Sequence, residues 1–567
     1  MILRLGLLLC CVIGFFSCGN KPRPALFPVR GADAHLYAFS RQAAEGNLIF
    51  SGPEKNEYRF ESPPPVPPLP SFEIEYTFSV PPSPETKKQY QAVLESGGQS
   101  WALPLDLSFM GIDESAATAV FHYAVPAGSS FAERFSVTIL PDGMGQKKSV
   151  SNNGGVPVLV IRSIEFRDRW FGFHAEPGGS PGEKHFFVTP FVFARQDGFV
   201  IDPPPVSALP ENGGLLPELN VEFEQGSAAV VSAGNTRFEA APYPERFHIP
   251  AGIMTPDERP LVISGGSPAA FRLSYAPLPA FPVPITADPG MALAWPQERW
   301  RISRYEVFRW DSFPSLLIFD TADYAVQDRM LKRLAFFAEK AGFRGRLASD
   351  AEIAPLHGWN AHDYRAADIA RFFDAARRSK FPLSGEEKEL EQILFDAGII
   401  LLTGDGGVSG GSGGIISISR ESEDYLRSRF MAHEGFHGIF FIDEDFRNFS
   451  RRRWDMLPAQ AKHFITSYFD FQHYDINDGY LMVNEFMAHI LQQPVSQAGN
   501  YFGKTIAARI ESSPWRRALL PEKDEVSNSW PDLARIFTTE AEAFSAYVNS
   551  RWGLAAGRAH LVSVRRP

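Results

Sequence analysis

Cysteine is scarce in this chain of 567 residues, and all three cysteines, Cys10, Cys11 and Cys18, stand at its N-terminal end. Disulfide bonds therefore do not hold the fold together. The remainder of the chain has no thiol nucleophile and no cysteine-based metal cluster. Metal binding or catalysis there must use histidine, carboxylate or hydroxyl side chains.

An excess of basic residues is also missing. The formal net charge is -11 at pH 7, which argues against a nucleic acid as the main partner. No apolar run reaches the ~20 residues of a membrane-spanning helix. The apolar fraction of 44% and charged fraction of 21% are those of a folded protein, and the length indicates roughly two to four domains.

Residues 1–17 have the pattern of a signal peptide. Arg4 supplies the positive charge, and an apolar run over residues 5–16 follows it. Ser17 then directly precedes Cys18, and the stretch FFSC resembles the lipobox of bacterial lipoproteins. This resemblance implies cleavage before Cys18, lipid attachment to that residue and a lipid anchor in the membrane of the cell envelope. The alternative is an ordinary secretion signal with an incidental cysteine.

In bacterial lipoproteins, the residue after the lipidated cysteine indicates which membrane of the envelope carries the protein. No Asp follows Cys18, so the resemblance to lipoproteins implies the outer membrane or the cell surface rather than the inner membrane.

A tether and spacer occupy residues 18–70, and their proline-rich end is expected to adopt an extended polyproline II conformation. Two β-sandwich-like domains are predicted over residues 71–205 and 215–292. Short β-branched and aromatic runs alternate there with Gly, Pro, Asn and Asp clusters. Trp170 and Phe171 are candidates for contact with a glycan, although aromatic residues of sandwiches usually belong to the core.

Residues 293–567 are predicted to form a separate α+β domain, because strand-like and helix-like periods alternate. Residues 315–320 are expected to form a buried strand, and Ser384 with Glu387 forms a capping box that opens a helix. The glycine-dense stretch 403–414 is expected to form a flexible hairpin or lid, because it lacks the Lys-Ser/Thr of a phosphate loop and the strand 414–419 follows it.

The stretch RFMAHEGFHGIFF over residues 429–441 carries the pattern that indicates chemistry. His433 and His437 are four residues apart on a predicted helix, for which Ser422 can act as the N-terminal cap. Both imidazoles project from one face about one turn apart, a distance at which two nitrogens bind one Zn²⁺ ion. Glu434 lies one residue round the helix, within reach of water on the metal. The alternative, two core histidines satisfied by neighbours, is costly without a metal.

Zinc needs a third protein ligand and an open position. The first candidate is Glu485, on the apolar face of a second predicted helix. His489, one turn further on, is a supporting residue or a rival ligand, and His473 is a weaker rival. Asp443 and Asp445 follow the first helix too closely to turn back and are candidates for orienting a histidine.

His433-Glu434-x-x-His437 followed by Asn484-Glu485-x-x-Ala488 resembles the gluzincin group of zinc metallopeptidases. The resemblance implies a zincin-like fold and one Zn²⁺ ion held by His433, His437 and Glu485. It makes Glu434 the general base and the strand 414–419 the edge strand that binds the substrate backbone.

The same resemblance implies hydrolysis of protein or peptide substrates, in which Glu434 accepts a proton from the zinc-bound water and passes it to the leaving amine. In gluzincins with a long spacing before the glutamate, a tyrosine shortly before it faces the metal. Tyr480, or else Tyr474, is expected to stabilise the oxyanion.

Two other functional classes stay open at this level. One is a surface binding lipoprotein in which the β-domains engage ligands and the zincin domain is inactive. The other is glycan hydrolysis by a pair of carboxylates, although no pair is distinguished by the sequence.

Overall fold

The computed structural model describes residues 268–512 and 530–566, apart from positions 341, 357 and 359. Between residues 48 and 265 it describes chiefly the strands and the turns beside them. The predicted signal peptide and the lipidation site Cys18 lie outside these residues, as does most of the predicted spacer. None of the helices so described is both long and apolar enough to cross a membrane.

The chain divides into two compact units, Met1–Ala194 with Pro204–Asn212, and Arg195–Pro203 with Gly213–Pro567. Together they contain several sheets and many helices, as expected of a multidomain α+β protein.

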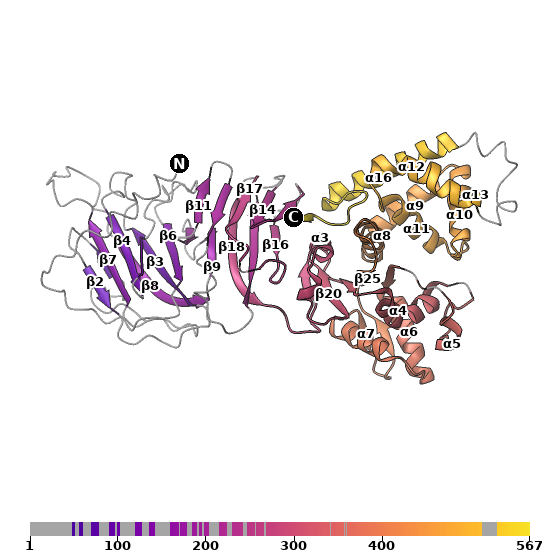
Figure 1. Cartoon of the computed structure of the whole chain (residues 1–567), viewed down its shortest axis with the longest axis horizontal. Coiled ribbons are helices and arrows are strands. Elements are labelled where there is room, and N and C mark those ends of the chain that lie inside the picture. The colour runs from indigo at the N-terminus through magenta and orange to yellow at the C-terminus, as the bar shows by residue number, and fades with distance from the viewer. Residues whose placement is uncertain are drawn as a thin grey trace. The chain divides into compact units, whose positions relative to one another are not determined.

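The first unit consists of strands in its described parts (Figure 1). One sheet has the order β1-β8-β3-β6-β10-β9, in which only β6 and β10 run parallel, and a second has the order β2-β7-β4-β5. Trp170 and Phe171 begin β9, and their side chains lie outside the described residues. The strands are β1 (Leu48–Phe50), β2 (Asn56–Arg59), β3 (Pro70–Phe78), β4 (Tyr90–Ser96), β5 (Gln99–Ala102), β6 (Ala119–Pro126), β7 (Phe135–Pro141), β8 (Leu159–Asp168), β9 (Trp170–Pro177), β10 (Lys184–Val188) and β11 (Val192–Arg195).

The second unit begins with two antiparallel sheets. One runs β12-β17-β14-β15-β26 and the other β18-β13-β16. Alternate residues of β13 are buried, and Phe199 of the first sheet contacts Phe271 of the second with ring centroids 5.0 Å apart. The strands are β12 (Gly198–Ile201), β13 (Leu215–Phe223), β14 (Ala229–Ala233), β15 (Thr236–Ala240), β16 (Arg246–Ile249), β17 (Leu261–Ser264), β18 (Pro268–Pro277) and β26 (Val562–Arg565).

The structure differs from the expected division at residue 292. Strand β19 (Ile285–Ala287) pairs in parallel with β20 (Tyr305–Trp310) and so belongs to the sheet of the α+β part. The C-terminal strand β26 instead extends the sheet of β15. The buried carboxylate of Asp288 joins the two regions, because it accepts hydrogen bonds from the backbone N–H groups of Leu561 and Val562.

The α+β part is built on a five-stranded sheet with the order β19-β20-β21-β25-β22, which adds β21 (Leu316–Thr321), β25 (Gly414–Ser419) and β22 (His362–Arg365). All residues of β21 and β25 are buried. The expectation that the strand at 414–419 lies at the edge is wrong, because β25 pairs with β21 on one side and β22 on the other. Its continuous burial is that of an internal strand, and the edge is the short, polar β22.

The glycine-dense stretch contains the turn and the second strand of a two-stranded hairpin, in which β23 (Ile400–Leu402) pairs with β24 (Val408–Gly410). The hairpin expected there is thus confirmed. The capping box of Ser384 and Glu387 is also confirmed at the start of α7.

Opposite faces of the five-stranded sheet carry different helices. Leu317, Phe319 and Ile415 belong to the core that packs against α4, α6 and α7. Their neighbours Leu316 and Ile416 face α8 instead, as the two-residue period of a strand requires. The helices of this half are α3 (Pro289–Leu293), the 3₁₀ turn η3 (Gln297–Arg299), α4 (Tyr324–Glu339), α5 (Asp350–Ile353), α6 (Ala366–Ser379) and α7 (Gly385–Asp396).

Helix α8 lies between the sheet and the C-terminal helices (Figure 1). A Cβ on Gly438 would stand 2.9 Å from Leu316 Cδ1, and one on Gly435 would stand 2.9 Å from Ala559 Cβ. The two glycines therefore allow α8 to approach its neighbours closely. The helices are α8 (Asp424–Ile442), α9 (Glu444–Met456), α10 (Ala459–Phe471), α11 (Gly479–Leu491), α12 (Val495–Asn500), the π-helical turn η4 (Tyr501–Ile506), α13 (Ala507–Ser512) and α16 (Trp530–Trp552).

The N-terminal half of α8 is held by charge. Arg427 donates two hydrogen bonds to the Asp320 carboxylate of β21, at 2.9 and 3.0 Å, and both side chains are buried. Arg420 also pairs with Asp320, at 2.7 Å. The expected cap at Ser422 is wrong, because the N-cap residue is Glu423 and the Ser422 hydroxyl bonds to the Tyr324 hydroxyl instead.

We predict that Asp320→Ala lowers the free energy of unfolding by about 3–5 kcal/mol, because it leaves Arg427 buried without a carboxylate. Chemical denaturation followed by circular dichroism measures the change. The control is Arg346→Ala, which removes an ion pair with Glu352. The two side chains of this pair are 50% and 44% exposed, so the free energy of unfolding should hardly change. Equal effects of the two substitutions would contradict the assignment of Asp320 as the anchor of α8.

Candidate metal centre

Helix α8 brings the two motif histidines together. The Nε2 atoms of His433 and His437 are 3.1 Å apart, and their rings meet edge to face with centroids 4.7 Å apart. His437 is fully buried and His433 is largely buried. Two ring nitrogens at this distance point at one place, as the i, i+4 spacing predicts.

The burial of the helix is not confined to the face that carries the two histidines. Leu426, Phe430 and Phe441, which share that face by their spacing, are half-buried. The segment from Met431 to Phe440 is instead buried on nearly all sides, because the sheet covers one side and α11 and α9 cover others. Glu434, 6% exposed, is thereby buried as well.

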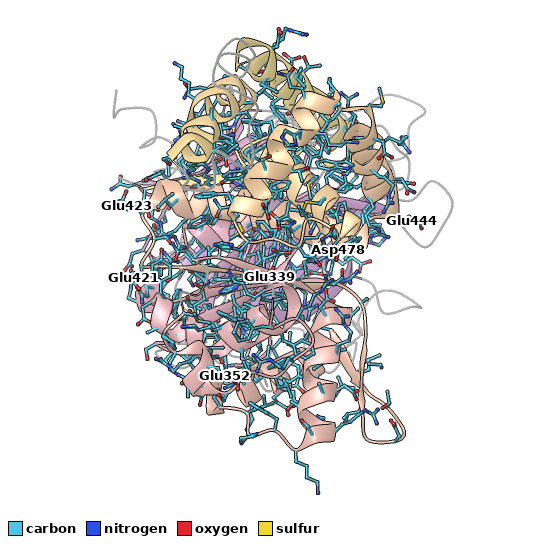
Figure 2. All side chains as sticks on the ribbon, turned by 90° about the vertical axis from the view of Figure 1, so that its right-hand side faces the viewer. Glu339, Glu352, Glu421, Glu423, Glu444 and Asp478 are labelled. Atoms are coloured by element: carbon cyan, nitrogen blue, oxygen red, sulfur yellow. The ribbon has the colours of Figure 1, made fainter. Side chains whose placement is uncertain are left out.

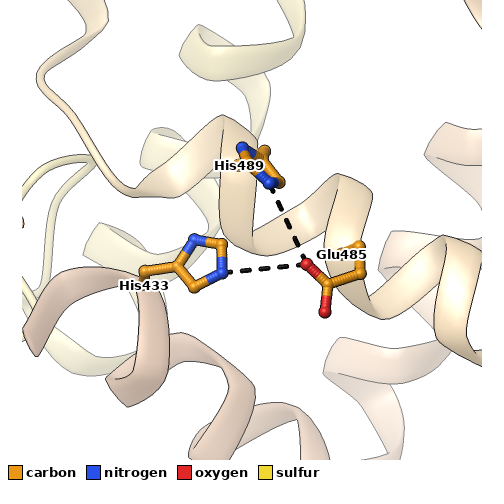
Figure 3. A group of neighbouring side chains, drawn as sticks. All are labelled: His433, Glu485 and His489. Atoms are coloured by element: carbon orange, nitrogen blue, oxygen red, sulfur yellow. Dashed lines mark ion pairs between the residues drawn. The ribbon is translucent and has the colours of Figure 1, made fainter. Parts of the chain in front are cut away.

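Helix α11 supplies the third candidate ligand. Glu485 Oε2 lies 3.8 Å from His433 Nε2, and Glu485 Oε1 lies 3.7 Å from His437 Nε2. His489, four residues on, places its Nε2 atom 3.9 Å from Glu485 Oε2 (Figure 3). His433, Glu485 and His489 thus form one group able to hold a metal ion.

The electrostatics of this group favour a cation. Burial raises the pKa of the Glu485 carboxyl well above its usual value, and Asp363 and Glu339 add to the shift. Burial also lowers the pKa of His433 well below its usual value, with His437 and His489 adding to the effect. Among the described side chains, Glu485 Oε2 is a buried oxygen without a hydrogen-bond partner.

A divalent metal needs neutral imidazoles and an ionised carboxylate, and the lowered pKa of His433 meets the first of these needs. An ion between these donors fits the residues present, because it would satisfy the unpartnered oxygen and keep Glu485 ionised.

A second group able to hold a metal ion adjoins the first and consists of Asp363, Glu434 and His437. Asp363 comes from the edge strand β22, and its Oδ1 atom is 3.9 Å from His437 Nε2. Burial raises the pKa of Glu434, and the charge of Asp363 and a hydrogen bond with it raise the value further. Without a cation nearby, this shift favours the protonated form of Glu434.

Asp363 was missed by the sequence analysis. It lies in a short polar strand, HDYR, with no spacing motif that relates it to the histidine helix. The pairing of β22 with β25, directly before α8, is what brings it to the site.

The two candidate tyrosines occupy different places. Tyr474 follows α10 and is half-buried. Burial is the main cause of the raised pKa of Glu485, and a hydrogen bond from Tyr474 partly offsets this rise. Tyr480 lies instead under the Arg365 guanidinium, 4.7 Å from the ring centroid, and its ring contacts Phe440. The structure thus brings Tyr474 to the group and directs Tyr480 toward Arg365.

The other predicted residues lie outside both groups. His473 is in the turn after α10 with a φ of 65°. Asp443 caps α9 and pairs with Arg551, which also pairs with Asp445, so these carboxylates bind an arginine rather than a histidine.

Glu339, at the end of α4, was not singled out by the sequence. It lies in the middle of the face shown in Figure 2. Its charge contributes to the raised pKa of Glu434, for which burial is the main cause, and so adds negative charge to the surroundings of the site.

Comparison with known proteins assigns no family to the chain. No family model matches it, and neither does any of the curated proteins.

We predict that Glu485→Gln weakens binding of a divalent ion, measured with Zn²⁺ against a chromophoric chelator, by more than roughly 100-fold. Loss of a residue that only supports a ligand already costs about 10–100-fold. The control is His473→Gln, which removes the rival ligand outside both groups and should leave the affinity unchanged. Unchanged affinity in the Glu485 variant together with weakened affinity in the His473 variant would show that Glu485 is not a metal ligand.

Proposed function

We propose that the protein is a zinc-dependent peptidase of the gluzincin type, acting on proteins or peptides at the bacterial envelope. The observation that carries the proposal is the convergence of His433, His437 and Glu485, with a buried carboxylate oxygen of Glu485 that lacks a protein partner among the described residues. Two imidazoles and one carboxylate are the ligand set of many catalytic zinc sites.

The arrangement of elements supports the same proposal. A mixed sheet with a short antiparallel edge strand is followed by the histidine helix and then by the helix that carries Glu485, which is the order expected of a zincin-like domain. In the part of the chain that the structure describes, β22 has no strand on its outer side. An extended peptide can pair with such an edge, and here it would pass next to Asp363.

Zn²⁺, when bound, supplies a Lewis acid that polarises the scissile carbonyl and makes water acidic enough to attack near neutral pH. His433, His437 and Glu485 would hold the ion, which leaves a position open for the reaction.

Glu434 is the general base of the proposed reaction. It lies beside the metal ligands but belongs to the adjoining group with Asp363. Its ionised carboxylate takes one proton from the attacking water and then delivers that proton to the nitrogen of the leaving amine. Asp363, hydrogen-bonded to Glu434, orients this carboxyl group.

Tyr474 is the proposed donor to the developing oxyanion. Its hydroxyl already faces the site, where it bonds to Glu485. The phenol of Tyr474 is neutral and keeps its proton, since removal of its hydroxyl from water raises the pKa of Tyr474 well above its usual value. A preorganised donor of this kind contributes to the rate in a site that excludes water.

We predict that Glu434→Gln retains zinc but lowers turnover by roughly 10²–10⁴-fold, because the amide cannot accept the proton. A mixed peptide library, digested and mapped by mass spectrometry, measures the cuts. The matched control is Glu423→Gln on the same helix, since Glu423 is exposed and makes no side-chain cap bond. Chelation should abolish the cuts and added Zn²⁺ should restore them.

Cuts made by the parent and the Glu423 variant alone would support a metallopeptidase and give its subsite preference. Undiminished cutting by the Glu434 variant would eliminate the mechanism, and no cutting by any of the three would favour a binding protein.

A second prediction separates the two tyrosines. Tyr474→Phe should lower kcat by roughly 10²–10³-fold, the usual effect of losing one oxyanion donor, and should weaken zinc binding by no more than about 10–100-fold, because its hydroxyl also bonds to Glu485. Tyr480→Phe should leave kcat within a few-fold of the parent, because the Tyr480 ring lies under Arg365. Steady-state kinetics on one cleaved peptide measures both. A large loss in the Tyr480 variant alone would reinstate that residue as the oxyanion donor.

A further inference from the structure

His489 is enclosed by aromatic rings beside the metal centre. His489 is 8% exposed, and its ring contacts the ring of His433 at a centroid distance of 4.9 Å. Tyr468 and Phe469 of α10 lie 5.4 Å away on other sides, and Tyr501 stacks on it at 6.3 Å. A histidine in such a place either binds the metal or supports a residue that does.

Two groups approach His489 from the side away from Glu485. The Tyr501 hydroxyl lies 3.0 Å from His489 Nδ1, and Gln492 Nε2 lies 2.9 Å from the same atom. Gln492 Nε2 also donates to the Tyr501 oxygen at 2.7 Å, so the hydroxyl proton of Tyr501 is free to point at Nδ1. Nδ1 therefore accepts two hydrogen bonds.

The orientation of the Gln492 amide agrees with the backbone beside it. Gln492 Nε2 also lies 3.4 Å from the carbonyl oxygen of His489, to which only the amide nitrogen can donate. The amide nitrogen therefore faces His489.

An imidazole whose Nδ1 accepts two hydrogen bonds carries its proton on Nε2 when it is neutral. Nε2 is the atom that faces Glu485, 3.9 Å from Oε2. A nitrogen that bears a proton is not a metal ligand, but it is a donor to a carboxylate.

The partners on this side are themselves fixed. Tyr501 begins the π-helical turn η4 and lies under the Arg429 guanidinium, 4.8 Å from its ring centroid. Arg429 in turn donates to Gln493 Oε1 at 2.9 Å. Irregular turns of this kind frequently occur at functional sites.

We propose that His489 is a positioning residue, kept in the Nε2–H form by Gln492 and Tyr501, which turns this N–H toward the Glu485 carboxylate 3.9 Å away and is therefore excluded as a metal ligand. This inference rests on the proposed function and deepens it. A zinc ion with three protein ligands keeps a position open for catalysis, whereas a fourth ligand makes a closed, structural site. By fixing the proton of His489, Gln492 and Tyr501 thus favour an open, catalytic centre over a closed, structural one.

Gln492→Glu tests the inference on the intact zinc-loaded protein. A carboxylate at this position accepts a proton from Nδ1, which moves the His489 proton away from Nε2 and frees that nitrogen for the metal. Zinc X-ray absorption should show two imidazole ligands in the parent and three in this variant, and kcat should fall by roughly 10–100-fold. Gln493→Glu is the matched control, because residue 493 is equally buried but bonds to Arg429, and it should keep two imidazoles.

Three imidazoles in the parent would overturn the inference, as would two imidazoles and unchanged kcat in the Gln492 variant. The imidazole count does not depend on peptide cleavage. If the expected counts appear without any cleavage, the assignment of His489 stands and the proposed peptidase function fails.

A measurement on the parent protein tests the position of the His489 proton directly. Nitrogen NMR of the metal-free protein with ¹⁵N-labelled histidine should place the His489 proton on Nε2, with the signal assigned by its loss in His489→Gln. A proton on Nδ1 would overturn the proposal.

Discussion

The buried ion pair of Asp320 and Arg427 is the interaction on which the site depends. Asp320 belongs to the central strand β21 and Arg427 to the first half of α8, so their two hydrogen bonds join the sheet to the histidine helix. Gly435 and Gly438 then let the second half of the helix approach its neighbours. A buried pair of this type fixes a geometry more than it adds stability. Here the geometry it fixes is the position of His433 and His437 relative to the edge strand.

Carboxylates from three elements converge on that position. Asp363 comes from β22, Glu434 from α8 and Glu485 from α11, and burial raises the pKa of both glutamates. A protein without a cation can hold them together only by keeping protons on some of them. The free-energy cost of burying these carboxylates together is the physical argument for a metal ion. The hydrogen bond to Asp363 distinguishes Glu434, the proposed base, from Glu485, the proposed metal ligand.

The C-terminal helices complete the site from the other side. They supply Glu485, the hydroxyl of Tyr474 and the amide of Gln492, which on our proposal sets the protonated nitrogen of His489. The chain then returns to the preceding β-region, where β26 extends the sheet of β15 and the buried Asp288 holds the backbone of Leu561 and Val562. The helices that carry half of the site are thus tied at their end to a different sheet.

Local patterns in the sequence determined much of this protein. The continuous apolar strand at 315–320, the capping box of Ser384 and the four-residue spacing of His433 and His437 depend only on neighbours in the chain, and the structure has all three. The position of Glu485 beside them followed from its place on an apolar helix. The tertiary structure alone decided that β22 and not β25 forms the edge, that Asp363 reaches Glu434, and that Tyr474 rather than Tyr480 faces Glu485. Each of these depends on contacts between segments that are distant in sequence. The periodicity of a helix or strand predicts which of its faces is buried, but not which other element packs against that face.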